Sequence, residues 1–387
     1  MRVISLTEET RLTGSYAATI GFFDGVHLGH RYVLQQLCRQ ARERGLPSMA
    51  ITFDRHPRQV VDTSWHPLLL TTLDEKIELL RQTDIDVLVV LPFDEQMACL
   101  SARDFMRLVL KERLGVSMLL TGYDNRFGHR TADSHEGFDD YVKYGREIGI
   151  DVFCGEGLQA LRQQDDRTTR QQDSKTIGRQ DNKTIGQQDS KTIGQQDSKT
   201  IGQQDDRTTR QQDSKTIGRQ DNKTIGRQGN KTIREQMYIS SSLIRRLLGE
   251  GRVDEAALFL GRPYSLNGTV VHGFQKGRTM GFPTANMSAD ECRLVPADGV
   301  YAVKVSLPPS TFPGITNIGM RPTFDGHQRT IETHILDFEG DLYGRDISIG
   351  FVARLRDEQH FESPEELAQQ MARDAETAKQ VLLDADL

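Results

Sequence analysis

The sequence predicts two folded domains of different class: a doubly wound parallel α/β domain, then a small antiparallel β-barrel with a C-terminal helix. Strand-like and helix-like stretches alternate over residues 16–160, which is typical of parallel βαβ units. From about Leu266 the pattern changes to short strands broken by Gly, Pro and Asp. Between these regions, residues 163–234 consist of nine consecutive octapeptides of the type QQDSKTIG.

Length and charge support this division. The chain has 387 residues, and the 315 outside the repeat are enough for two hydrophobic cores. The repeat contains 15 Lys and Arg against 10 Asp and Glu, whereas the remainder contains 34 against 45. So acidic a body is a poor general nucleic-acid binder, and we expect no nucleic-acid partner. We place the α/β domain at 1–162 and 235–262, the insertion at 163–234 and the barrel at 263–387.

Cysteine usage and hydropathy predict a cytoplasmic protein. The four cysteines are scattered without a CxxC pair, which fits a reducing compartment and argues against a zinc knuckle. The N-terminal MRVISLTEET has early acidic residues and no apolar segment, so we expect no signal peptide. No uncharged apolar run approaches 18 residues, so we expect no membrane span. Nothing in the sequence indicates an obligate protein partner.

Hydrophobic periodicity predicts the elements of the first domain. Short apolar or β-branched runs indicate buried strands, and i, i+3, i+4 spacing indicates helices. The predicted strands are Tyr16–Ile20, Ser48–Phe53, Val87–Leu91 and Met118–Thr121. The predicted helices are 29–44, Asp74–Arg81 and one that Ser101 caps and that carries Phe105, Leu108 and Val109.

The octapeptide repeat offers at most one Ile per unit and no aromatic residue. A solenoid needs several apolar positions per repeat, because one Ile cannot offset the entropy of ordering eight residues. We interpret the repeat as a disordered surface insertion, since loop-closure entropy grows only logarithmically with length. A partner-binding tether is the less favoured alternative.

The chain beyond the repeat predicts two short helices and then the barrel. Ser240 or Ser241 caps a helix that ends at Gly249, and a second helix spans Val253–Leu260. The C-terminal helix begins at Ser363-Pro364, with Glu366 placed to complete a capping box. The predicted barrel strands are Gly268–His272, Val300–Ser306, Ile315–Ile318, Thr330–Leu336 and Ile347–Leu355.

The most informative segment is GFFDGVHLGH, which lies between the first predicted strand and helix. Glycines let the backbone approach a phosphate, and the helix N-terminus supplies free N–H groups. Two histidines three residues apart suit charge stabilisation on an α-phosphate, although ordinary loop histidines or a metal half-site are alternatives. We therefore predict nucleotide binding by the residues Gly21, Phe22, Asp24, Gly25, His27 and His30.

This stretch resembles the HxGH nucleotidyltransferases, and further motifs narrow the resemblance to bacterial bifunctional riboflavin kinase/FAD synthetases. The motifs are TFDRHP at 52–57, LSA at 100–102, GYD at 122–124, RFG at 126–128 and SSSLIR at 240–245. The resemblance implies that His27 and His30 are catalytic, that Ser241, Ser242 and Arg245 bind ATP phosphates, and that Asp124 and Arg126 bind flavin. Simple N-capping explains Ser240 but not Arg245. Asn125 departs from the family pattern.

A second phosphate site is predicted at GFQKGRTMGFPTAN, residues 273–286. Its glycines permit a nest of N–H donors, and Thr284 and Asn286 offer oxygen ligands for Mg²⁺. GFPTAN resembles the riboflavin kinase signature, as do NIG at 317–319, RPTF at 321–324 and DLYG at 341–344. The resemblance implies nucleotide contacts from Gly277 and Arg278 and a flavin contact from Arg321.

Strand alternation places Glu332 and His334 on one face of a strand, which without context would be a solvated polar face. The resemblance instead implies that Glu332 is the base on the ribityl hydroxyl, with His334 structural. The implied function is Mg-ATP-dependent phosphorylation of riboflavin to FMN, followed by adenylylation of FMN to FAD. Alternatives are a kinase whose adenylyltransferase the insertion has disabled, and a non-catalytic flavin-binding scaffold.

Overall fold

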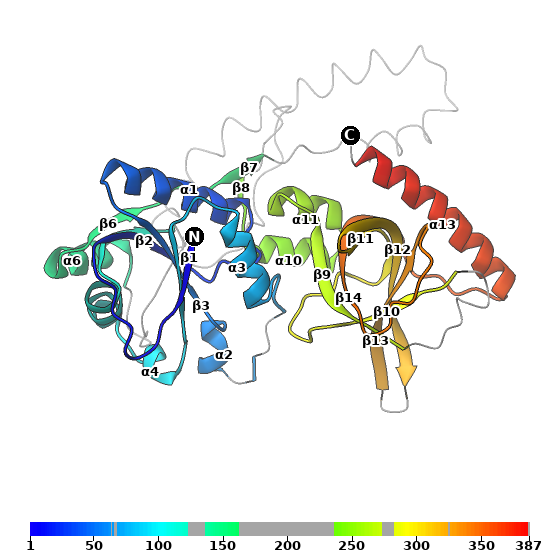
Figure 1. Cartoon of the computed structure of the whole chain (residues 1–387), viewed down its shortest axis with the longest axis horizontal. Helices are drawn as coiled ribbons and strands as arrows, with labels where there is room; N and C mark the ends of the chain where they lie inside the picture. The colour runs from blue at the N-terminus through cyan, green and yellow to red at the C-terminus, as the bar shows by residue number, and fades with distance from the viewer. Residues whose placement is uncertain are drawn as a thin grey trace, which may run out of the picture. The chain divides into compact units, whose positions relative to one another are not determined.

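The structure is a computed structural model of the whole chain, and it describes residues 1–62, 64–65, 68–122, 136–161, 236–272, 282–323 and 326–385. Residues 1–160 and 238–387 form one compact unit. This unit contains both a parallel sheet and a β-barrel (Figure 1). The octapeptide repeat lies outside the described residues, so its interpretation and the domain boundaries around it stay predictions.

The α/β region is built on a six-stranded sheet in the order β1-β4-β3-β2-β5-β6, and every strand pair in it is parallel. The four predicted strands are confirmed, and two short edge strands, β1 and β6, were not predicted. A separate two-stranded sheet consists of β7 and β8. The strand bounds are β1 Arg2–Ser5, β2 Tyr16–Ile20, β3 Ser48–Phe53, β4 Val87–Leu91, β5 Val116–Thr121, β6 Asp151–Cys154, β7 Gln159–Leu161 and β8 Gln236–Tyr238.

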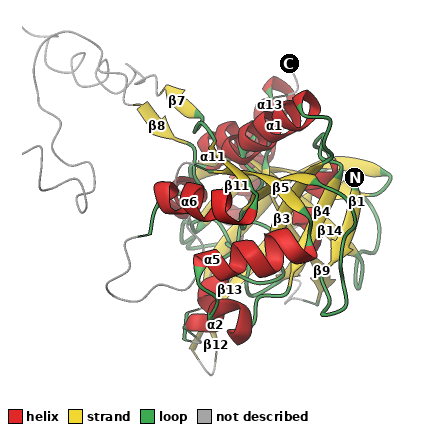
Figure 2. Cartoon of the chain, turned by 90° about the vertical axis from the view of Figure 1, so that its left-hand side faces the viewer, coloured by secondary structure: helices red, strands yellow, loops and turns green. Residues whose placement is uncertain are grey.

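Helices cover both faces of the parallel sheet, as a doubly wound fold requires (Figure 2). On one face, Leu34 and Cys38 of α1 pack against strand residues that include Leu88. On the other face, Phe105 and Tyr141 pack in the largest hydrophobic cluster. The helices are α1 Leu28–Glu43, α2 Pro57–Val61, α3 Leu73–Arg81, α4 Glu95–Ala98, α5 Ala102–Asp104, η1 Phe105–Arg113, α6 Phe138–Ile148, α10 Ser241–Gly249 and α11 Val253–Leu260.

The helix capped by Ser101 differs in its winding from the prediction. After one turn of α-helix it continues as a π-helix, η1. Phe105 and Val109 are buried as expected, but Leu108 is only half-buried, and Met106 and Leu110 fill the core instead. A π-helix has i→i+5 hydrogen bonds and therefore a wider turn than an α-helix, which changes the residues that face the core.

The C-terminal region is a closed six-stranded barrel in the order β10-β13-β12-β11-β14-β9. The five predicted strands are present, most of them longer than expected, and β10 was missed because its sequence ANMSA lacks a β-branched residue. Helix α13, Pro364–Asp384, packs on the barrel through Ala378 and Leu382 (Figure 1). The strands are β9 Tyr264–Val271, β10 Ala285–Ala289, β11 Gly299–Leu307, β12 Ser310–Thr323, β13 Gly326–Ile335 and β14 Asp346–Arg356.

The predicted serine caps are observed, but the capping box predicted for the C-terminal helix is not formed. Ser240, rather than Ser241, caps α10 by accepting the Leu243 N–H. Ser363 caps α13 by accepting the Glu366 N–H at 3.2 Å. The Glu366 carboxylate, however, accepts from the Glu362 N–H one residue before the cap, so the predicted reciprocal bond of a capping box is replaced by this contact.

Candidate functional site

The first candidate site lies at the turn between β2 and α1. The chain passes from β2 through β3 to β4 and then returns beside β2 to form β5, so the strand order reverses at β2. Ligands of doubly wound sheets bind in the crevice outside the carboxyl ends of the strands at such a point. A cavity of about 270 Å³ opens there, and it is lined by the predicted residues Gly21, Phe22, Asp24, His27, His30, Ser241, Ser242 and Arg245.

The backbone of this turn is held in an unusual conformation. Phe23, Gly25 and Val26 all have positive φ angles, of 53°, 81° and 39°. A Cβ on residue 25 would lie 2.9 Å from the Leu70 side chain, so this position requires glycine. The Gly25 N–H donates to the Thr71 hydroxyl at 3.0 Å. The structure thus uses Gly25 for close packing beside the cavity.

The two histidines stack on each other with their ring centroids 3.6 Å apart. His27 caps α1, because its Nδ1 accepts the His30 N–H at 3.2 Å. Burial, Arg245 and Arg262 lower the pKa of His27 to about 3. Burial and the neighbouring His27 hold the pKa of His30 well below its usual range. Both imidazoles are therefore neutral near pH 7, and since Nδ1 of His27 is an acceptor, its proton lies on Nε2.

Gly29, between the histidines, is fixed by its surroundings. A Cβ there would lie 2.8 Å from the Ile239 carbonyl oxygen and 3.1 Å from the His27 ring. Only glycine lets α1 approach the chain that enters α10 so closely. A side chain at Gly29 would therefore disturb both the His27 ring and the contact with the segment that enters α10.

Asp24 and Arg245 form a buried clamp beneath the cavity. The Asp24 carboxylate is 2% exposed and accepts from the N–H groups of Leu70 and Thr71 at 3.0 and 3.1 Å. Arg245 completes its shell with an ion pair and also donates from Nε to the Leu68 carbonyl at 3.0 Å. Asp24 thus binds protein groups, which makes it a positioning residue, whereas Arg245 is partly exposed and faces the cavity.

Helix α10 directs its N-terminus at the same cavity. Ser241 donates from its hydroxyl to the Asp24 carbonyl at 2.9 Å, which ties the helix to the turn. Ser240, Ser241 and Ser242 all line the cavity, as does Arg245 one turn later. The first N–H groups of a helix have no intrahelical partner and carry partial positive charge. The arrangement therefore suits an anionic group between α10 and the histidines.

Lys76 supports this site, although the sequence reasoning missed it. It is 2% exposed and donates to the carbonyls of Phe22 and Phe53 at 3.1 and 3.3 Å, with its ammonium 4.0 Å from the Phe22 ring centroid. Burial lowers its pKa to about 8. Its signal in the sequence was a lysine next to Ile77 on the apolar side of a predicted helix. Its function is to hold together the ends of β2 and β3.

Two further residues near the turn were also missed. His56 packs between Phe22 and Trp65, with ring centroids 4.7 and 4.6 Å apart, and burial lowers its pKa to about 4. Trp65 thus packs against a residue that lines the cavity. Arg262 donates to the Gly25 carbonyl at 2.8 Å. Burial lowers the pKa of Arg262 to about 10.

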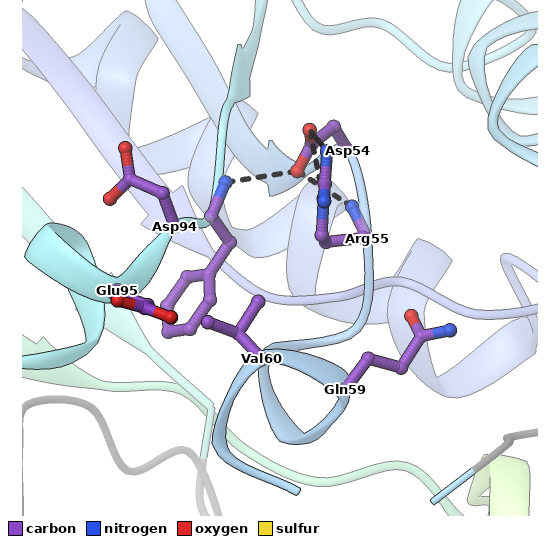
Figure 3. A pocket seen from close by; sticks show the side chains of 7 residues that line it. Asp54, Arg55, Gln59, Val60, Asp94 and Glu95 are labelled. Carbon is purple, nitrogen blue, oxygen red and sulfur yellow. Dashed lines mark hydrogen bonds and ion pairs between the residues drawn. The ribbon is translucent and has the colours of Figure 1, made fainter. Parts of the chain in front are cut away.

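A neighbouring cavity of about 580 Å³ lies at the carboxyl ends of β3 and β4 (Figure 3). Asp54 accepts from the Phe93 N–H at 2.9 Å and thereby joins the two strand ends. Asp94 caps α4 by accepting the Met97 N–H at 2.7 Å. The lining residues are Asp54, Arg55, Gln59, Val60, Phe93, Asp94 and Glu95.

The barrel has its own cavity, of about 590 Å³, which Thr284, Asp341 and Tyr343 help to line. Next to Thr284, Asn286 lies directly across from Glu332 in the β10–β13 register, and Asn317 faces Glu332 from β12. Three polar side chains from adjacent strands therefore share one face. The Nδ1–H of His334 donates to the Pro283 carbonyl at 2.8 Å, which supports its predicted structural role.

Some predicted site residues cannot be placed. Asp124, Arg126, Gly277 and Arg278 lie outside the described residues. Arg321 belongs to β12, but its side chain lies outside the described part. Their assignments stay predictions.

Comparison with known proteins gives consistent matches over both regions. The FAD synthetase family matches residues 10–165, and the riboflavin kinase family matches residues 260–382. A bifunctional riboflavin kinase/FMN adenylyltransferase from Escherichia coli is 32% identical, over 94% of this chain and 91% of that protein. The Bacillus subtilis protein of the same description is 30% identical, over 98% and 97%.

One solved structure has a similar fold over the length of the chain. A crystal structure titled macrolide-efflux protein from Streptococcus pneumoniae matches with a TM-score of 0.71 and 24% identity, over 98% of this chain and 99% of that one. That likeness concerns the fold alone. Among the residues that the structure describes, we find no helix of the length and apolarity needed to cross a bilayer.

Proposed function

Because this chain belongs to the family of bifunctional riboflavin kinase/FMN adenylyltransferases, we propose that its two reactions take place at the two separate sites described above. The chain is an enzyme of flavin biosynthesis. It transfers a phosphoryl group from ATP to riboflavin, giving FMN, and an adenylyl group from ATP to FMN, giving FAD and pyrophosphate. The observation that carries the proposal is the stacked, neutral histidine pair in the crevice beside α10.

In adenylyl transfer, a phosphate oxygen of FMN attacks the α-phosphorus of ATP, and the bond to pyrophosphate breaks. The attacking phosphate is already an anion, so the step needs charge stabilisation rather than a general base. A neutral His27 with its proton on Nε2 donates a hydrogen bond to an α-phosphate oxygen. The Nδ1 of His30 is buried without a hydrogen-bond partner among the described residues, and we assign it to the same phosphate.

The departing pyrophosphate is assigned to α10. Its first N–H groups and the hydroxyls of Ser241 and Ser242 supply neutral donors, and Arg245 supplies the positive charge. Because Asp24 anchors one end of the Arg245 guanidinium, the remaining donors are held in a fixed direction. Preorganised donors of this kind stabilise charge that develops in the transition state.

We assign the isoalloxazine ring of FMN to the cavity at β3 and β4 (Figure 3). Neighbouring strands lie about 5 Å apart, so the ends of β3 and β4 are about 5 and 10 Å from the end of β2. That separation lets a ring seated beside Phe93 and Val60 present its phosphate to the histidines. Asp124 and Arg126, predicted from the family resemblance, are proposed as further flavin contacts.

In the kinase reaction, the riboflavin hydroxyl attacks the γ-phosphorus of ATP, and ADP leaves. Glu332 is proposed to accept the hydroxyl proton, and its position opposite Asn286 supports this role. Thr284 and Asn286 provide oxygen atoms of the kind that Mg²⁺ prefers, so these residues fit the predicted ion. When bound, Mg²⁺ neutralises phosphate charge. Gly277 and Arg278 are proposed to contact ATP, and Arg321 to contact flavin.

We also propose a cytoplasmic location, because all four cysteines are free, as expected in a reducing compartment.

A chromatographic time course with riboflavin, Mg²⁺ and ATP tests the two-site assignment. FMN is expected first, followed by FAD. His30→Ala should stop FAD formation and leave FMN formation near normal, and Glu332→Gln should stop FMN formation and leave conversion of supplied FMN to FAD intact. Loss of both activities in either folded variant would refute the assignment. Accumulation of FMN without FAD in the unmodified protein would support the alternative of a disabled adenylyltransferase.

A further inference from the structure

One loop of the barrel contacts both segments that supply partners to Asp24, namely residues 69–71 and helix α10. This barrel connector, residues 290–298, joins β10 to β11. At one end, the Leu69 N–H donates to the Cys292 carbonyl at 2.7 Å, and the Leu294 N–H donates to the Leu69 carbonyl at 2.9 Å. Further along, the Ala297 N–H donates to the Leu248 carbonyl of α10 at 2.9 Å.

The side chain of Arg293 strengthens the first of these contacts. It is 4% exposed, forms an ion pair with Glu75 of α3, and donates to the Ser265 carbonyl of the barrel. Glu75 also accepts from the Asn267 amide at 2.6 Å and from the Thr72 N–H at 2.8 Å. The carboxylate that caps α3 is therefore the carboxylate that binds the barrel.

Each of the two segments held in this way carries hydrogen-bond or ion-pair partners of Asp24. Leu70 and Thr71, which immediately follow the bridge at Leu69, donate their N–H groups to Asp24. Helix α10, whose C-terminal end meets Ala297, carries Arg245. A shift of either segment against the barrel would move a partner of Asp24.

We propose that Arg293 is a positioning residue for adenylyl transfer, so that the barrel, which carries the kinase site, also holds the adenylyl site in its working geometry. The proposal rests on the function proposed above for the His27 and His30 turn. A buried guanidinium needs fixed partners, and Arg293 has one in each domain, Glu75 and Ser265. Its charge is satisfied only while the two are docked.

The test is Arg293→Met in the full chain, with the kinetics of FMN-to-FAD and riboflavin-to-FMN conversion measured separately. A misplacement of about 1 Å can cost on the order of 100-fold in rate, so we expect a 10- to 100-fold lower kcat/KM for FAD formation, carried mainly by kcat. FMN formation should stay within about twofold, because Arg293 lies outside the kinase cavity. Arg293→Lys should recover part of the loss.

Arg356→Met is the matched control. Arg356 also pairs with a buried carboxylate, Asp374, at 2.8 Å, but both partners belong to the barrel and α13. This variant should loosen the barrel without a selective effect on FAD formation. If Arg293→Met proves unstable, Glu75→Gln removes the same ion pair more gently and should lower FAD formation selectively. In a double-mutant cycle, the Glu75 and Arg293 effects should be less than additive.

Equal FAD formation in folded Arg293→Met and unmodified protein would overturn the proposal, as would equal losses in Arg293→Met and Arg356→Met. His30→Ala separates this failure from failure of the proposed function. If His30→Ala abolishes FAD formation while Arg293→Met does not affect it, only the positioning inference is wrong. If His30→Ala leaves FAD formation intact, the site assignment itself is wrong.

Discussion

Replacing His27 with Asn separates the two functions that the structure gives to this side chain. Asn carries an acceptor oxygen near the place of Nδ1, so it can still cap α1 by accepting the His30 N–H. It lacks the Nε2–H donor and the titrating ring. We expect FAD formation to fall by about 100-fold or more, as for the loss of one preorganised donor, with little change in folding stability at pH 7.

The Asn variant should also differ from the unmodified protein in how its folding stability depends on pH. Folding lowers the pKa of His27 from 6.5 to about 3, so the unfolded chain binds a proton that the folded site excludes. The contribution of the neutral His27 to the free energy of unfolding is fully present above pH 6.5 and is lost as the pH falls towards 3. At pH 5 the difference of 1.5 pH units corresponds to about 2 kcal/mol. The Asn variant should therefore lose about 2 kcal/mol less than the unmodified protein between pH 7 and pH 5.

Urea unfolding followed by tryptophan fluorescence measures this difference. Trp65 is the only tryptophan, and it packs on His56 in the α/β region, so its signal reports that region. His56 and His30 are present in both proteins, which leaves His27 as the difference between them. If both proteins lost the same stability from pH 7 to pH 5, the interpretation of His27 as a buried neutral histidine would be wrong.

Three further substitutions test other parts of the two sites. Glu332→Gln should lower FMN formation by about 100- to 10,000-fold, the usual range for loss of proton-transfer catalysis, with FMN-to-FAD conversion as the internal control. Arg245→Met should lower FAD formation and cost about 3 kcal/mol in urea unfolding, because it leaves the Asp24 carboxylate buried without its cation; an unchanged midpoint would contradict the ion pair. Gly29→Ala should reduce thermal stability and FAD formation together, since its Cβ would meet the Ile239 carbonyl at 2.8 Å; a fully active, equally stable variant would show that α1 and the entry to α10 are not in contact.

The fold class could be predicted from the sequence because the hydrophobic patterns of the main strands and helices are uninterrupted. Continuous apolar runs such as Val87–Leu91 predicted buried parallel strands, and all four predicted strands of the sheet are present. Three strands that were missed, β1, β6 and β10, take their conformation from a neighbouring strand rather than from their own composition. Strand propensity depends on such partners, so short strands of mixed composition are hard to predict.

The site was predictable as far as motifs mark it. The histidines, the serines of α10 and Arg245 meet at one cavity, although the chain separates them by more than 200 residues. Sequence reasoning could not reveal that Asp24 faces Arg245 and the Leu70 and Thr71 N–H groups, because long-range pairing carries no local signal. Lys76 was missed for the same reason: its partners are backbone carbonyls of distant strand ends.

The bond between Ser241 and the Asp24 carbonyl joins positions 217 residues apart along the chain. Without the 72-residue repeat the separation would be 145. If the added residues contribute only length, the extra closure entropy is about 0.4 kcal/mol, from (3/2)RT times the logarithm of the ratio of the two lengths. One octapeptide more or less changes that cost by only about 0.03 kcal/mol. The number of octapeptides can therefore drift through copying errors with almost no thermodynamic selection against it, provided that α10 still reaches the turn.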